Sequence, residues 1–220
     1  MVLGIYGIGG VGRETLDIAR AMQTTGKQWK DVVFVDDNKF GQNVHGVEVI
    51  AFEDALGRYG PCGMEMSVAV GEPESKRMLR EKLSKAGIKL ANVIHPDAYI
   101  ARSARFGDGL IMREGAKLSC DCVVGENVCF ENYAILGHDG LMGDDCQVST
   151  FSAIAGNCKV GNQVYFGLGS MIKEGMSIGN YAIVGMSACI LRDVPPQAIM
   201  MGNPARVMGT NERKRVFGLR

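Results

Sequence analysis

The chain has 220 residues, of which 46% are hydrophobic and 22% charged, and its 24 basic residues balance 24 acidic ones. A zero formal net charge argues against generic binding of nucleic acids or other polyanions, which requires a basic excess. No apolar run is long enough to span a membrane and the N-terminus lacks a signal-peptide pattern, so we expect a cytoplasmic protein.

The first strand and helix enclose a glycine-rich turn. A buried strand is expected at Val2–Tyr6 and a helix at 13–20, with Gly7-Ile8-Gly9-Gly10-Val11-Gly12 between them. This is a G-x-G-x-x-G pattern in strand–turn–helix context, in which glycines let the backbone approach a ligand. The N-terminus of the helix favours phosphate or another anion.

A second strand, at 32–35, ends in acidic residues that could accept hydrogen bonds from a ribose: Asp36 and Asp37, followed by Asn38. Helices are expected at 52–59 and 73–86, and a further strand at 66–70 ends at Gly71. Together these elements predict a small Rossmann-like parallel sheet of about four strands over residues 1–90.

Three interpretations of residues 1–90 compete. The domain is small for a complete NAD(P)-binding sheet, and a glycine turn can also serve only the packing of a βαβ unit. The third interpretation is a half-sheet that binds a nucleotide-linked ligand. We favour it because of the domain that follows, since the motif alone does not decide.

Residues 91–220 carry a six-residue repeat. An apolar residue recurs at every sixth position from Ile94 to Ile190, and the residue four places later is small or apolar throughout. Neither a helix nor simple strand alternation has this period, whereas a hexapeptide-repeat parallel β-helix does. Glycine often follows the key apolar residue, and we expect it to relax the backbone at a corner. The fold class is therefore α/β plus β, with domains at 1–90 and 91–220.

The seven cysteines predict neither a disulfide framework nor a metal site. Cys122, Cys146 and Cys158 occupy the inward-facing small position of the hexads, and no pair of C-x-x-C motifs is present. We expect reduced thiols and no metal.

One of the three histidines stands out. His45 is expected in a surface loop or hairpin and His95 in an extended segment that caps the first coil. His138, in contrast, projects outward from a hexad beside Asp139. A neutral imidazole is suited to accept a proton near pH 7, and a neighbouring carboxylate can orient it.

The segment after the last hexad reads Gly202-Asn203-Pro204-Ala205-Arg206. It is interpreted as a cap that blocks end-to-end stacking, and its arginine as a partner for a phosphate. The basic tail at 211–220 is expected to be a solvated terminus.

These features together resemble the bacterial sugar O-/N-acetyltransferases with a left-handed β-helix, the group of the bacillosamine and perosamine N-acetyltransferases and the sialic acid O-acetyltransferases. The resemblance covers nearly the whole chain and implies the left hand of the helix. It also implies a homotrimer that binds acetyl-CoA as acyl donor between adjacent prisms.

The resemblance assigns roles to individual residues. It implies that His138 is the general base, Asp139 raises its basicity and the Gly156 amide donates to the thioester carbonyl. Coenzyme contacts are implied for Gln147, Gly156, Leu168, Met186, Asn203 and Arg206. Contacts with the acceptor's nucleotide are implied for Gly9, Gly10, Val11, Asp36, Asp37, Asn38 and Gly71.

The chain departs from its relatives at three places. Several relatives carry a histidine at Val11, others have Asn-Thr where this chain has Glu131-Asn132, and some have a coenzyme-contacting histidine at Gln147. These departures affect the acceptor and the local coenzyme contacts rather than the reaction class.

The sequence thus predicts an acetyl-CoA-dependent N-acetyltransferase acting on a nucleotide-linked amino sugar. Three alternatives stay open at this point: O-acetylation of sialic acid or another surface sugar, transfer of a longer acyl chain, and a non-catalytic trimeric scaffold that binds sugar nucleotides.

Overall fold

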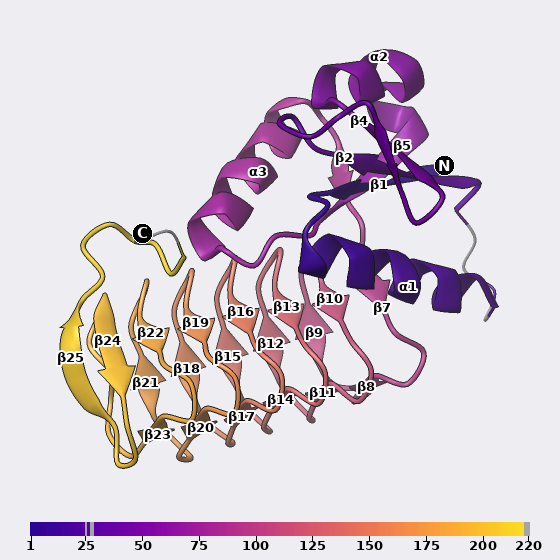
Figure 1. Ribbon diagram of the computed structural model, residues 1–220. Coiled ribbons are helices and arrows are strands. Elements are labelled where there is room, and N and C mark those ends of the chain that lie inside the picture. The colour runs from indigo at the N-terminus through magenta and orange to yellow at the C-terminus, as the bar shows by residue number, and fades with distance from the viewer. Residues whose placement is uncertain (25, 27–28, 218–220) are drawn as a thin grey trace.

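The computed structural model describes residues 1–24, 26 and 29–217 and shows a mixed α/β unit above a triangular prism of stacked strands (Figure 1). Within these described residues, no helix has the length and apolar character needed to cross a membrane.

The N-terminal sheet has six strands in the order β3-β4-β2-β1-β5-β6, two more than the sequence predicted. The two extra strands form an antiparallel hairpin on its edge, closed by His45 in the left-handed region (φ 51°). The elements are β1 (Val2–Tyr6), α1 (Gly10–Thr24), β2 (Asp31–Val35), β3 (Gln42–Val44), β4 (Val47–Ile50), α2 (Phe52–Gly63), β5 (Met64–Val68), α3 (Pro73–Lys85) and β6 (Lys89–Leu90).

The prism has three faces, each a stack of parallel strands. The first face contains β7 (Val93–Ile94), β10 (Ile111–Met112), β13 (Cys129–Phe130), β16 (Gln147–Val148), β19 (Tyr165–Phe166), β22 (Ile183–Val184), β24 (Ala198–Met201) and the antiparallel β25 (Arg206–Thr210). The second contains β8 (Tyr99–Ile100), β11 (Lys117–Leu118), β14 (Ile135–Leu136), β17 (Ala153–Ile154), β20 (Met171–Ile172) and β23 (Cys189–Ile190). The third contains β9 (Arg105–Phe106), β12 (Val123–Val124), β15 (Leu141–Met142), β18 (Lys159–Val160) and β21 (Ser177–Ile178).

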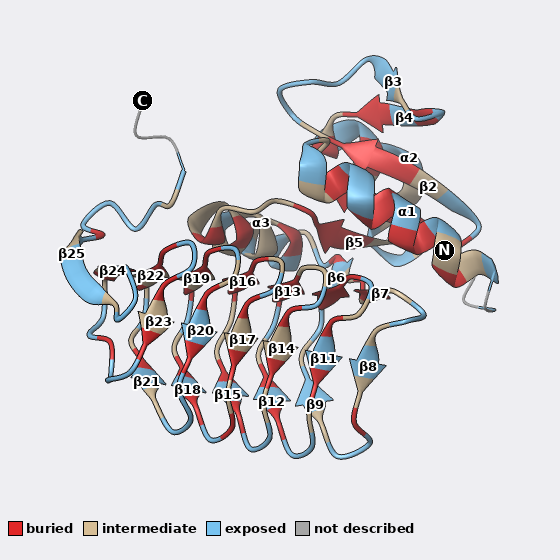
Figure 2. Cartoon of the chain, turned by 60° about the horizontal axis from the view of Figure 1, so that its bottom comes forward, coloured by how far each residue is buried: buried red, intermediate tan, exposed pale blue. Residues whose placement is uncertain are grey.

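The predicted hexad residues fill the interior of the prism. Phe130 pairs with Met112 on one side and with Val148 on the other, and all three are fully buried. On the second and third faces, from β11 and β12 onward, each strand buries its second residue, and the buried segments recur along the stack (Figure 2). Phe106 departs from this pattern and is 36% exposed, because it belongs to the first coil, which has no neighbour on its outer side.

The corners of the prism are not formed mainly by glycine, as the sequence led us to expect. From Gly109 to Ser187 every sixth residue has a positive φ, and most of these residues are not glycine. The glycine directly after a strand instead makes room for the next coil. A Cβ on Gly137, for example, would lie 2.5 Å from the backbone nitrogen of Gly156. Glycine is therefore required there for close approach rather than for backbone conformation.

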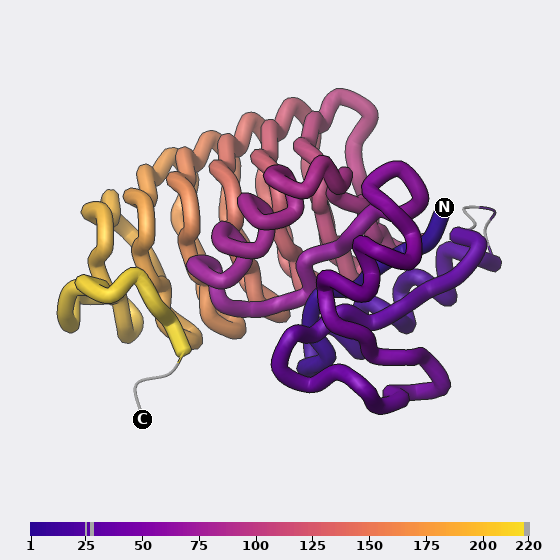
Figure 3. The backbone as a smooth tube through the Cα atoms, turned by 90° about the horizontal axis from the view of Figure 1, so that it is seen from above, coloured from indigo at the N-terminus to yellow at the C-terminus, as the bar shows by residue number. Residues whose placement is uncertain are grey.

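The N-terminal domain lies on the first face of the prism, over the early coils (Figures 1 and 3). Residues of α1 share a hydrophobic core with Val93, Ile111 and Cys129 of that face. The guanidinium of Arg80, on α3, donates to Asp145 at 2.7 Å. Lys76 is fully buried beside this ion pair, and burial lowers the pKa of its ammonium group. These contacts fix the N-terminal domain to one face.

Candidate active site

His138 lies two residues after β14, on the edge between the second and third faces, which we call the histidine edge. Its Nδ1 lies 2.8 Å from Oδ2 of Asp139. Asp139 occupies the left-handed corner position (φ 56°), and both side chains are about half exposed. An ionised carboxylate at Nδ1 holds the ring proton there and leaves Nε2 as the basic atom.

The electrostatics of the pair favour a basic imidazole. The hydrogen bond with Asp139 is the main cause that raises the pKa of His138 above its ordinary value, and partial desolvation opposes it. The charge of Glu174 adds to the rise.

Gly156 lies directly beneath the imidazole, one coil further along. A Cβ at this position would lie 2.5 Å from both Cε1 and Nε2 of His138. The neighbouring amides of Ala155 and Asn157 donate to backbone carbonyls, whereas no acceptor for the Gly156 N–H is found within the part of the chain that the structure describes. This amide is thus a free donor beside the basic nitrogen, the arrangement that can stabilise a developing oxyanion.

Glu174 occupies the same edge one coil beyond Gly156 and was not predicted as a site residue. Its carboxylate accepts a hydrogen bond from Nδ2 of Asn157 at 3.2 Å. The 18-residue period that relates His138, Gly156 and Glu174 was present in the sequence and could have identified it.

Most of the predicted coenzyme residues gather on another edge, between the first and second faces, which we call the methionine edge. Leu168 and Met186 are neighbours there on successive coils, 49% and 71% exposed. The turn with Asn203 and Arg206 continues the same edge, since the Gly202 carbonyl accepts from the Cys189 amide at 3.0 Å. One whole face separates this edge from His138.

Gln147, also predicted to contact the coenzyme, lies on neither the histidine edge nor the methionine edge. Its side chain is 1% exposed on the first face, where Nε2 donates to Oε1 of Glu131 at 3.0 Å. The domain packed on this face covers it, so Gln147 presents no open surface to a coenzyme.

The predicted acceptor residues meet at the carboxyl ends of three neighbouring parallel strands, β2, β1 and β5. The chain leaves β1 in one direction to form β2 and in the other to form β5, which makes this a topological switch point, the usual ligand site of such sheets. A Cβ on Gly9 or Gly10 would contact nothing within 4 Å, whereas one on Gly12 would lie 1.9 Å from the Gly7 carbonyl oxygen. The turn therefore packs tightly on one side and is open on the other.

The exposed carboxylate of Asp37 accepts hydrogen bonds from three groups of its own domain. Burial alone would raise the pKa of its carboxyl group, but hydrogen bonds from Lys82, Tyr6 and the Phe52 N–H lower it. Its Oδ1 accepts from the first amide of α2 at 2.9 Å, and its Oδ2 accepts from the Tyr6 hydroxyl at 2.6 Å. Among the described residues, Asp36 accepts a hydrogen bond only from the Asn38 amide, so it is the freer of the two carboxylates.

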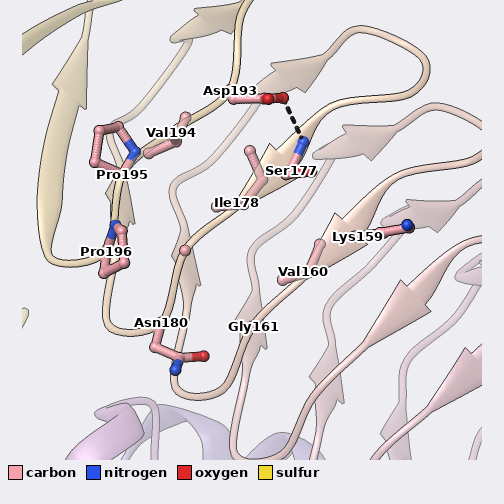
Figure 4. Close-up of a pocket in the computed structure, with 11 residues that line it drawn as sticks. Lys159, Val160, Gly161, Ser177, Ile178, Asn180, Asp193, Val194, Pro195 and Pro196 are labelled. Carbon is pink, nitrogen blue, oxygen red and sulfur yellow. Dashed lines mark hydrogen bonds between the residues drawn. The ribbon is translucent and has the colours of Figure 1, made fainter.

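A shallow cavity of about 560 Å³ lies at the end of the third face, between β18, β21 and Pro195-Pro196, and contains none of the predicted site residues (Figure 4). Over residues 211–217 the basic tail is not a free terminus as expected, because the amides of Val216 and Phe217 donate to the carboxylate of Glu72; the remainder of the tail, 218–220, lies outside the described residues. No group of three metal-ligating side chains is found among the described residues.

The fold and the histidine edge define a class: a left-handed β-helix of the acyltransferase type joined to a nucleotide-binding type of α/β domain. Residues 2–83 match the family described as the PglD N-terminal domain. The chain is 28% identical over 212 residues to GDP-perosamine N-acetyltransferase of Escherichia coli O157:H7. The aligned region covers 93% of this chain and 95% of that protein.

Two solved structures are similar over nearly the whole chain. The acetyltransferase domain of PglB from Neisseria gonorrhoeae, in complex with acetyl coenzyme A, has a TM-score of 0.88 and 29% identity over 94% of this chain and 98% of that one. PerB from Caulobacter crescentus, in complex with CoA and GDP-perosamine, has a TM-score of 0.87 and 28% identity over 95% of this chain and 98% of the PerB chain. The resemblance is confirmed: over nearly its whole length the chain is similar to bacterial sugar N-acetyltransferases, and it shares their left-handed β-helix fold.

Substitution of Gly156 tests the geometry of the pair. We expect Gly156→Ala to displace the imidazole and to lower kcat for acyl transfer by about 10²- to 10³-fold, with the thermal stability changed little, because Gly156 does not need a left-handed φ. In a His138→Ala background the added methyl meets no ring, so the same substitution should cost much less. Equal losses in both backgrounds would contradict the contact.

The pH dependence tests the Asp139 interaction. Because the folded-state pKa of His138 is raised, the neutral base is lost as the pH falls through a value above the ordinary histidine range, and kcat/KM should fall there. Asp139→Asn removes the main cause of the shift and should move this acidic limb to lower pH. Identical pH–rate profiles for both proteins would show that Asp139 does not tune the base.

Proposed function

We propose that this chain is an acetyl-CoA-dependent N-acetyltransferase that acts on the amine of a nucleotide-linked amino sugar. The observation that carries the proposal is the His138–Asp139 pair above the free amide of Gly156, in a chain similar over its whole length to enzymes named as N-acetyltransferases. The complexes of PglB with acetyl-CoA and of PerB with CoA and GDP-perosamine support the donor and the acceptor class.

The chemistry follows from the geometry. The amine attacks the thioester carbonyl of acetyl-CoA while Nε2 of His138 accepts a proton from the attacking nitrogen. The Gly156 N–H donates to the carbonyl oxygen as negative charge develops on it. A C–N bond forms, the C–S bond breaks, and the imidazolium returns the proton to the departing thiolate. The products are the N-acetyl sugar and CoA, and no metal is needed.

The position of the N-terminal domain supports a shared active site. The histidine edge lies opposite the first face of the triangular prism, and the N-terminal domain is fixed to that first face. An acceptor bound at Gly9–Val11 is thus separated from His138 of its own chain by the body of the prism. A second copy must supply the histidine, and the homotrimer implied by the family provides one for every acceptor site.

The donor site is divided in the same way. Leu168, Met186 and the Asn203 turn lie on the methionine edge, and His138 and Gly156 on the histidine edge. We propose that the methionine edge of one copy lies beside the histidine edge of the next, so that acetyl-CoA binds in the cleft between them.

The acceptor panel tests the reaction. Thiol release from acetyl-CoA is measured with UDP-, GDP- and dTDP-linked amino sugars, with free sialic acid as the hydroxyl acceptor. We expect turnover with an amino sugar, and a loss of at least about 10²-fold in His138→Ala because it lacks the general base. Turnover only with sialic acid would show that the chain is an O-acetyltransferase and not an N-acetyltransferase. Near-normal activity of His138→Ala would refute the proposed mechanism.

Mixed assemblies test the shared site. Gly10→Glu has room for its side chain and places a negative charge in the predicted acceptor site, so it should be inactive, as should His138→Ala. Co-expression of the two at equal amounts should restore about a quarter of wild-type activity, because a random trimer pairs an intact acceptor site with an intact histidine in that fraction of sites. If each chain forms its own site, mixing restores nothing.

A further inference from the structure

The end of the chain forms a strap, residues 211–217, between the last coil of the prism and the N-terminal domain. Its first anchor is Asn211, which is 6% exposed. The Asn211 amide donates to the Gln197 carbonyl at 2.7 Å, and Nδ2 donates to the Tyr181 carbonyl at 3.0 Å. The start of the strap is therefore part of the prism.

The second anchor lies on the other domain. Both carboxylate oxygens of Glu72 accept from the Val216 amide at 3.0 Å, and one of them accepts from the Phe217 amide at 2.8 Å. The Phe217 ring also meets the ring of Tyr165, on the first face, edge to face with centroids 5.3 Å apart. Glu72 directly precedes α3, so the strap is held at the end of the β5–α3 turn.

Between its anchors the strap spans a hollow of about 570 Å³, whose floor is formed by Ile183, Ile199 and Met201. The middle of the strap is thus not packed into a core. The position of Phe217 depends on the Glu72 hydrogen bonds and on the Tyr165 contact.

Phe217 lies at the predicted acceptor site. A Cβ on Gly71 would lie 3.7 Å from Cε2 of Phe217 and 3.7 Å from Cγ2 of Val11. The carboxyl-end turns of β1 and β5 and the strap therefore meet at one point. About half of the Phe217 side chain (52%) is still exposed there.

The strap also brings positive charge to this place. Arg213 and Arg215 line the hollow together with Phe217. Neither guanidinium forms an ion pair with any residue that the structure describes. Together with the N-terminus of α1, these cations suit an anionic ligand that also has a flat apolar part.

We propose that the strap is a wall of the acceptor site and that Phe217 packs against the base of the acceptor's nucleoside diphosphate, with Arg213 and Arg215 facing its phosphates. This inference rests on the proposed function and adds a specificity-determining residue to it. The aromatic ring offers a stacking surface of the kind that any nucleobase can use. The sugar end of the ligand then points away from the strap, as it must to reach His138 of another copy.

Binding of free nucleotides tests the proposal without any need for catalysis. Isothermal titration calorimetry on the full chain with UDP, GDP and dTDP is expected to identify one nucleotide that binds. Phe217→Ala should weaken its binding by about tenfold or more, and Phe217→Trp should retain it. Met208→Ala changes another exposed apolar residue, which lies on β25 (67% exposed, against 52% for Phe217); it is the control and should bind as the wild type does.

Steady-state kinetics provide a second readout. In Phe217→Ala the KM for the nucleotide-linked acceptor should rise by a similar factor, while the KM for acetyl-CoA stays unchanged. A rise in the KM for acetyl-CoA alone would assign the hollow to the coenzyme and overturn the proposal. Unchanged nucleotide binding in Phe217→Ala would also overturn it. If the wild type binds a nucleotide but acetylates no acceptor, the proposed function fails while the strap is still tested.

Discussion

The parallel pairing of coils at an 18-residue step is the constraint on which the rest of the molecule depends. Each strand bonds to the strand one coil before and one coil after it, so residues 18 apart become direct neighbours along an edge. This places His138 over Gly156, and Gly156 one step before Glu174. A base, an amide donor and a distant acidic group are aligned by backbone hydrogen bonds alone, without a loop whose conformation must be selected.

The same register determines where the N-terminal domain packs on the prism. Asn127 and Asp145 are one step apart on the edge opposite the second face, and Asn127 donates both to Asp145 and to the carbonyl of Lys76 on α3. Because Asp145 also binds Arg80, removing any member would leave buried polar groups without partners. These buried hydrogen bonds hold the N-terminal domain against the first face of the prism, which is the face opposite the histidine edge.

Local patterns in the sequence predicted the prism and the helices and main strands of the N-terminal domain, but not the contacts between distant residues. Hexad spacing identified the interior positions and placed His138 outside, because the inward positions recur at a fixed local spacing. The strap and the burial of Gln147 depend on contacts between residues far apart in the chain, such as Glu72 with Phe217, which no local pattern encodes. Asp37 shows the same limit: its acidity suggested a ribose contact, while the hydrogen bonds that Lys82 and Tyr6 donate to its carboxylate come from residues far along the chain.

The raised pKa of His138 has two opposing consequences for its role as the proposed base. Asp139 and Glu174 both raise the pKa of His138, which makes Nε2 a stronger base toward an attacking amine. The same shift increases the fraction of imidazole that is already protonated, and hence inactive as a base, at a given pH. Both acidic groups lie on the exposed histidine edge, where water screens their charges, and desolvation of the imidazole opposes the rise. The basicity of Nε2 therefore depends on the balance between the acidic neighbours, which raise the pKa of His138, and desolvation, which lowers it.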